Sequence, residues 1–63
     1  SQMAVARLVY TLLAVLKYDI SSHKGSTNNL IVNASNLKGT PVTENFVSKW
    51  LKLASQAKSD STK

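Results

Sequence analysis

The sequence contains no cysteine, so neither a disulfide framework nor a thiolate metal site can stabilise the fold. With three acidic residues and one histidine, the chain has few side chains that could act in acid–base catalysis or bind a metal. The two glycines, Gly25 and Gly39, stand alone and form no glycine-rich phosphate-binding loop. We therefore expect a protein that is not an enzyme, with no cofactor, no metal and no small-molecule substrate.

Long apolar runs are also missing. The most apolar stretch, Met3 to Leu16, is 14 residues long and carries one charge, whereas a membrane span needs about 20 residues. It also has no small-residue cleavage site of the kind that follows a signal peptide. The sequence thus predicts no membrane span and an intracellular protein, cytoplasmic or nuclear.

The composition favours one small, basic, folded domain. Hydrophobic residues make up 43% of the 63 positions, which is too many for a disordered chain. Eight lysines and arginines against three acids give a formal net charge of +5. A chain this short buries only about 60% of its unfolded surface, so its stability is marginal. We expect a domain over residues 3–57 and a flexible polar tail or linker over 58–63.

Residues 3–18 carry the spacing of an amphipathic helix. The apolar positions recur at intervals of three and four residues, and they are Val5, Leu8, Val9, Leu12, Leu13 and Leu16. This face is expected to point into the core. The opposite face carries Ala6, Tyr10 and Ala14, with Arg7 and Lys17 nearby.

Residues 29–38 follow a polar loop at 19–28 and fit two structures. As a helix, the segment would begin after Asn28 or Thr27 and end at Gly39. As a strand, Leu30 to Val32 would be its core, but three asparagines argue against that interpretation and no partner strand is present. The helix is favoured, and the strand stays open.

Residues 43–57 show the sharpest amphipathic pattern. Thr43 is the expected N-cap, with the acidic Glu44 in the first turn. Phe46 and Trp50 lead the apolar face and are expected to supply much of the core. Three amphipathic helices at about 3–18, 29–38 and 43–57 predict an all-α fold, a small three-helix bundle with a helix-turn-helix-like layout.

The polar face of the third helix suggests nucleic-acid binding, because amide, hydroxyl and ammonium groups contact phosphates and base edges in a DNA groove. The residues predicted to bind DNA are Lys38, Thr43, Asn45, Ser48, Lys49, Lys52 and Gln56. Lys24 in the loop is expected to add a phosphate contact.

The alternative is a protein-interaction or dimerisation domain that forms part of a larger protein. The residues predicted to bind a protein partner or a second copy are Arg7, Tyr10, Ala14 and Lys17. An apolar groove between the first and third helices is a second place for such a partner. A membrane-active cationic peptide fits less well, because the loop and the C-terminal end are polar.

Overall fold

The computed structural model describes residues 1–61, and within them the chain forms three helices and no strand. They are α1 (Gln2–Val15), α2 (Ser26–Leu37) and α3 (Glu44–Ser61). The all-α three-helix prediction is confirmed, and the segment that also fitted a strand is helical. Residues 62 and 63, the last part of the predicted tail, lie outside the described residues.

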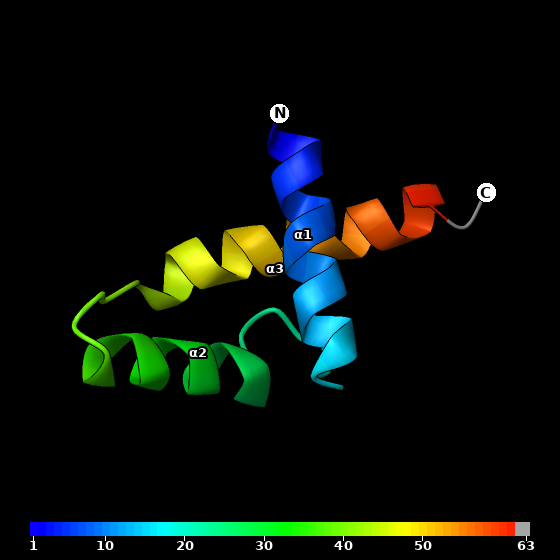
Figure 1. The fold of residues 1–63 in the computed structure, drawn as a ribbon. Coiled ribbons are helices and arrows are strands. Elements are labelled where there is room, and N and C mark those ends of the chain that lie inside the picture. The colour runs from blue at the N-terminus through cyan, green and yellow to red at the C-terminus, as the bar shows by residue number, and fades with distance from the viewer. Residues whose placement is uncertain (62–63) are drawn as a thin grey trace.

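The third helix is the support that the other two share (Figure 1). α2 and α3 lie side by side and run in opposite directions, joined by residues 38–43, whereas α1 crosses α3 near its middle. No Cα atom of α1 lies within 8 Å of a Cα atom of α2, although both helices pack on α3. The connection at 38–43 is longer than the three or four residues usual in a helix-turn-helix motif.

Both α1 and α2 end with a residue in the left-handed backbone conformation. α1 ends at Val15 because Lys17 has φ 63°, and the N–H of Tyr18 donates to the carbonyl of Leu13 at 2.9 Å. The predicted end at residue 18 is thus three residues too late. Gly39, with φ 79°, ends α2 in the same way, as the sequence predicts.

The first turn of α2 contains the two residues that the sequence assigns to its cap. The helix begins at Ser26, so Thr27 and Asn28 lie inside it, and both are buried. The Asn28 side chain is 0% exposed, and its Nδ2 donates to the carbonyls of His23 at 2.7 Å and Glu44 at 3.0 Å. One amide therefore joins the loop before α2, α2 itself and the start of α3.

Hydroxyl groups fix the connection between α2 and α3. Ser35 Oγ donates to the carbonyl of Val32 at 2.8 Å and accepts from the N–H of Val42 at 3.0 Å. Thr43 Oγ1 accepts from the N–H of Phe46 at 3.1 Å, which confirms Thr43 as the N-cap of α3.

The C-terminal end of α3 lies further along the chain than predicted. The helix continues past Ala57 to Ser61, so residues 58–61 are helical. Lys58 lies in the last turn of α3, where a cation is favourable to the helix dipole.

The core forms where α1 crosses α3. Leu13, Val47 and Leu51 are its large buried side chains. Three alanines on the two crossing helices, Ala6 in α1 and Ala54 and Ala57 in α3, are 0% exposed. Because a single methyl group occupies little space, such positions allow two helix backbones to approach closely.

Two predictions about the core are wrong. α1 buries the face that carries Ala6, while Leu8 and Leu12 of the predicted core face remain more than half exposed. Phe46 is 51% exposed and Trp50 is half-buried, so the large buried side chains of α3 are Val47 and Leu51 rather than the aromatics. The first error arises because α1 is apolar over more of its circumference than one neighbour covers.

Replacing Asn28 with alanine tests how far the fold depends on this amide. Asn28→Ala leaves two carbonyls without their donor, and we expect it to lower the free energy of unfolding by about 2–3 kcal/mol, measured by urea denaturation. Asn29→Ala is the matched control, because it removes an identical amide from the neighbouring position, where the side chain is exposed to solvent. Equal stability of the two variants would contradict the role of Asn28.

Lys17 offers a second test, because it holds a conformation that suits glycine. We expect Lys17→Gly to raise the melting temperature through relief of about 1 kcal/mol of backbone strain. Gly39→Ala, which introduces the same strain at the end of α2, should lower it by a similar amount. Loss of stability in Lys17→Gly would show that the lysine side chain matters more than its backbone.

Candidate nucleic-acid interface

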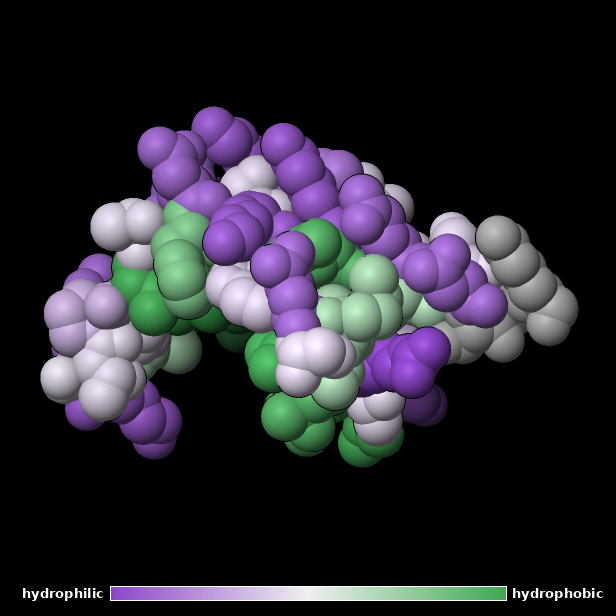
Figure 2. All heavy atoms as spheres, turned by 90° about the horizontal axis from the view of Figure 1, so that it is seen from above, coloured by the Kyte–Doolittle hydropathy of each residue, from purple (hydrophilic) through white to green (hydrophobic). Residues whose placement is uncertain are grey.

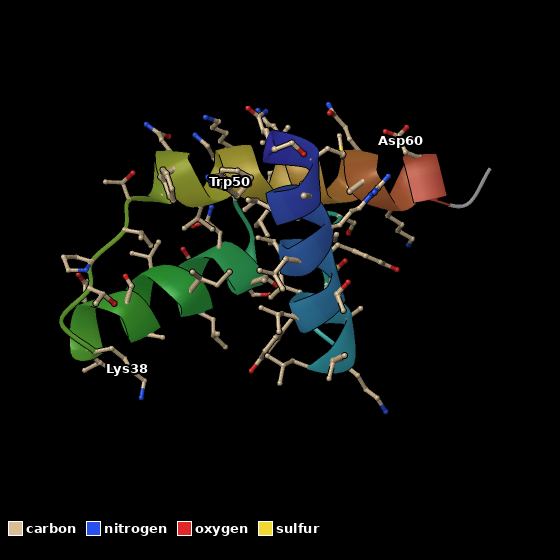
Figure 3. The ribbon with its side chains drawn as sticks, turned by 45° about the horizontal axis from the view of Figure 1, so that its top comes forward. Lys38, Trp50 and Asp60 are labelled. Carbon is tan, nitrogen blue, oxygen red and sulfur yellow. The ribbon has the colours of Figure 1, made fainter. Side chains whose placement is uncertain are left out.

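A row of polar side chains runs along the outer side of α3. Asn45, Lys49, Lys52 and Gln56 are all exposed, and we refer to these four residues as the α3 row. Their spacing of four, three and four residues places them within about 60° of the helix circumference, opposite buried Ala54. Nitrogen-tipped side chains project from this helix on the side away from α2 (Figure 3). The row spans 12 residues, and the 11 helical steps between its ends cover about 16 Å.

The loop before α2 adds a third cation to the α3 row. Lys24 Nζ donates to Oδ1 of Asn45 at 3.2 Å, which places this ammonium at the N-terminal end of the row. Lys49 Nζ lies 5.7 Å from the centroid of the Trp50 ring, within range of a cation–π interaction. No acidic residue occurs between Asn45 and Gln56, so the row carries three positive charges and no negative one.

Three of the residues predicted to bind DNA lie elsewhere or are already engaged. Ser48 is 4% exposed and therefore belongs to the buried side of α3, which corrects its predicted place on the polar face. Lys38 lies at the C-terminal end of α2 and points away from α3 (Figure 3). The Thr43 hydroxyl oxygen accepts the helix-capping bond from Phe46. The sequence does not predict these placements, because residue spacing defines the faces of a helix but not which other parts of the chain pack against each face.

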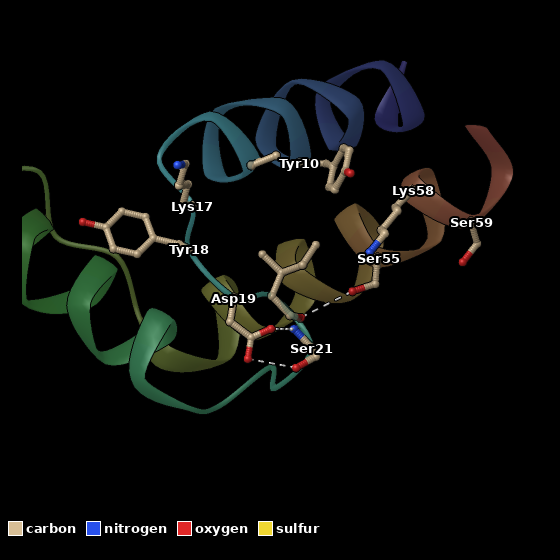
Figure 4. Close-up of a pocket in the computed structure, with 10 residues that line it drawn as sticks. Tyr10, Lys17, Tyr18, Asp19, Ser21, Ser55, Lys58 and Ser59 are labelled. Carbon is tan, nitrogen blue, oxygen red and sulfur yellow. Dashed lines mark hydrogen bonds between the residues drawn. The ribbon is translucent and has the colours of Figure 1, made fainter. Parts of the chain in front are cut away.

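Three of the four residues predicted to bind a protein partner line a hollow of about 570 Å³ beside α1 (Figure 4). Tyr10, Ala14 and Lys17 form one side of the hollow, and Ser55 and Lys58 of α3 form the other. Tyr10 is half-buried against this region, so it is less open than predicted. The fourth residue, Arg7, is exposed on α1 but does not line the hollow.

The carboxylate in this hollow is held by its own loop. Asp19 accepts hydrogen bonds from the N–H of Ser21 at 2.9 Å and from its hydroxyl at 3.0 Å. These two bonds, with a smaller contribution from Lys58, lower the pKa of the Asp19 carboxyl below its ordinary value. Asp19 therefore carries its charge at neutral pH and shapes the turn that leads into α2.

A second exposed surface consists of large apolar side chains on α1, which we call the α1 stripe. Its members are Val5, Leu8, Leu12, Val15 and Leu16, which are between 45% and 72% exposed. Seen down the axis of α1 from its N-terminus, hydrophobic side chains reach the surface along the lower edge of the molecule, whereas its upper edge is hydrophilic (Figure 2). The sequence predicts this stripe, but predicts it as buried.

An apolar groove of about 350 Å³ adjoins the α1 stripe at Val5, which belongs to both. Side chains of all three helices line it, among them Val9, Ile31, Phe46 and Trp50. An apolar groove was expected between α1 and α3, and the structure contains one there, with α2 forming an additional wall.

Among residues 1–61, no three His, Asp or Glu side chains come together as metal ligands. None of the helices described here combines the length and hydropathy needed to cross a bilayer. Comparison of the chain with protein-family models, with curated proteins and with solved structures gives no match. The side-chain arrangement is therefore the basis for assigning a function.

Proposed function

We propose that this protein is a non-catalytic module that binds nucleic acid, with DNA as the expected partner, through the outer side of α3. The observation that carries the proposal is the convergence of Lys24 with Lys49 and Lys52 on one exposed side of one helix. Lys24 is 21 positions from Asn45 in the sequence, yet its ammonium lies at hydrogen-bond distance from that side chain.

The dimensions of the α3 row suit a DNA groove. A major groove about 12 Å wide admits one α-helix, and a row of about 16 Å follows several base pairs along it. Asn45 and Gln56 at the two ends carry amides that can bond to base edges, whereas the lysines between them suit phosphates. The four side chains of the row are exposed although both other helices pack on α3, so the row is open to a large ligand.

The row contains lysine but no arginine, and this determines the kind of binding. Lysine acts as a point charge, whereas the planar guanidinium of arginine bonds to guanine through two atoms. Phosphate contacts therefore dominate, and we expect weak sequence preference with a strong salt dependence. Three lysines correspond to a slope of about −2.7 when the logarithm of the association constant is plotted against that of the salt concentration.

The test is fluorescence anisotropy with a labelled 20-base-pair duplex at 50 and 150 mM salt. We expect binding at the lower concentration, and we expect Lys49→Glu with Lys52→Glu to weaken it at least about tenfold, because two attractive contacts become repulsive. Lys52→Gln alone should reduce the salt slope by about 0.9.

A second double variant separates the site from the overall charge. Arg7→Glu with Lys38→Glu lowers the net charge from +5 by the same four units, at exposed positions outside the α3 row. We expect it to retain most of the affinity, with both double variants folded by circular dichroism. Equal losses in the two variants, or no binding of the unchanged protein at 50 mM salt, would refute the proposed site.

A further inference from the structure

The α1 stripe is an exposed apolar surface that takes no part in the proposed nucleic-acid site. Its five side chains lie within about 100° of the circumference of α1, and the centre of this arc is about 120° away from the buried face at Ala6 and Leu13. α1 thus has two apolar faces, of which α3 covers only one.

The spacing of the stripe is symmetric about the middle of α1. Leu8 and Leu12 lie equally far from position 10, and so do Val5 and Val15. When two copies of such a helix pack in opposite directions about a two-fold axis, Leu8 of one copy meets Leu12 of the other. Val5 then meets Val15, so each pair occurs twice, as an interface between identical surfaces requires.

The charges of the chain also permit a second copy at this place. Arg7 is the only charged residue in α1, and it lies about 130° around the helix from the centre of the stripe. Two copies paired through the stripe therefore bring no like charges face to face. Their net charges of +5 repel only at longer range, where salt screens them.

The exposed area of the stripe sets the strength of such a pair. With each side chain 45% to 72% exposed, the five offer on the order of 300 Å² of apolar surface per copy. Flanking atoms and the adjoining groove at Val5 extend this area, but the total stays at the low end for protein interfaces, below about 1,200 Å² for both partners. This area supports a weak, concentration-dependent dimer rather than a permanent one.

We propose that two copies of this chain associate through the α1 stripe, with their α1 helices antiparallel and Leu8 of each copy against Leu12 of the other. The α3 row lies on the far side of α3 and stays exposed in this dimer.

Sedimentation of the full chain between 10 µM and 1 mM tests the association. We expect the average mass to rise from monomer toward dimer over this range, and more steeply at 500 mM than at 50 mM salt. Leu12→Asp should weaken self-association at least about tenfold. The matched control is Leu37→Asp, because Leu37 is 89% exposed on α2 and lies outside the stripe.

The orientation is tested by disulfide trapping, because the chain has no cysteine of its own. We expect an equal mixture of Leu8→Cys and Leu12→Cys chains to give mainly the mixed disulfide under mild oxidation. A predominance of like-with-like disulfides would overturn the antiparallel arrangement.

The outcomes separate this proposal from the nucleic-acid site. Lys49→Glu with Lys52→Glu should leave self-association intact, because those residues lie outside the stripe. A chain that stays monomeric at 1 mM, or equal dimerisation of the Leu12 and Leu37 variants, would refute the dimer whatever the DNA result. Leu12-dependent binding to neutral phosphatidylcholine vesicles by a monomeric chain would likewise refute it and assign the stripe to a lipid surface.

Discussion

The buried amide of Asn28 joins the loop before α2, the first turn of α2 and the start of α3. The positions of the helices depend on this junction. Both N–H groups of the amide are used, one on the carbonyl of His23 and one on that of Glu44. A carboxylate of the same shape would turn an oxygen toward those carbonyls, so only an amide suits the position. Since His23 precedes Lys24, the side chain that bonds to the first residue of α3 also holds, through its other hydrogen bond, the loop whose ammonium reaches Asn45. The cationic side of α3 thus depends on a group that is wholly buried.

The sequence predicts the existence of all three helices, the cap at Thr43 and the glycine at the end of α2, because each depends on residues a few positions apart. It also predicts Asn45, Lys49, Lys52 and Gln56 as one exposed row, because helical spacing alone determines that. It cannot predict that Ser48 is buried or that α1 turns Ala6 inward. A wide apolar arc fits several rotations of a helix, and only the neighbouring helix selects one of them.

The two surfaces proposed for binding lie on different helices and differ in chemistry. Charge is concentrated on the outer side of α3, whereas large apolar side chains are exposed along α1. Their binding would respond to salt in opposite directions, since screening weakens attraction to phosphate and also weakens repulsion between copies. Because α3 carries one surface and supports the helix that carries the other, small changes in its packing affect both.

The two attachments to α3 also differ in kind, and temperature separates them. α2 packs Ile31 and Val32 against the core and is also held near its two ends by the hydrogen bonds of Asn28 and Ser35, whereas α1 rests on α3 mainly through alanines and Leu13. The hydrophobic contribution to stability weakens on cooling, whereas hydrogen bonds lack this dependence on apolar hydration. Near 0 °C the contacts of the crossing helix would therefore weaken more than the hydrogen bonds at the ends of α2 do.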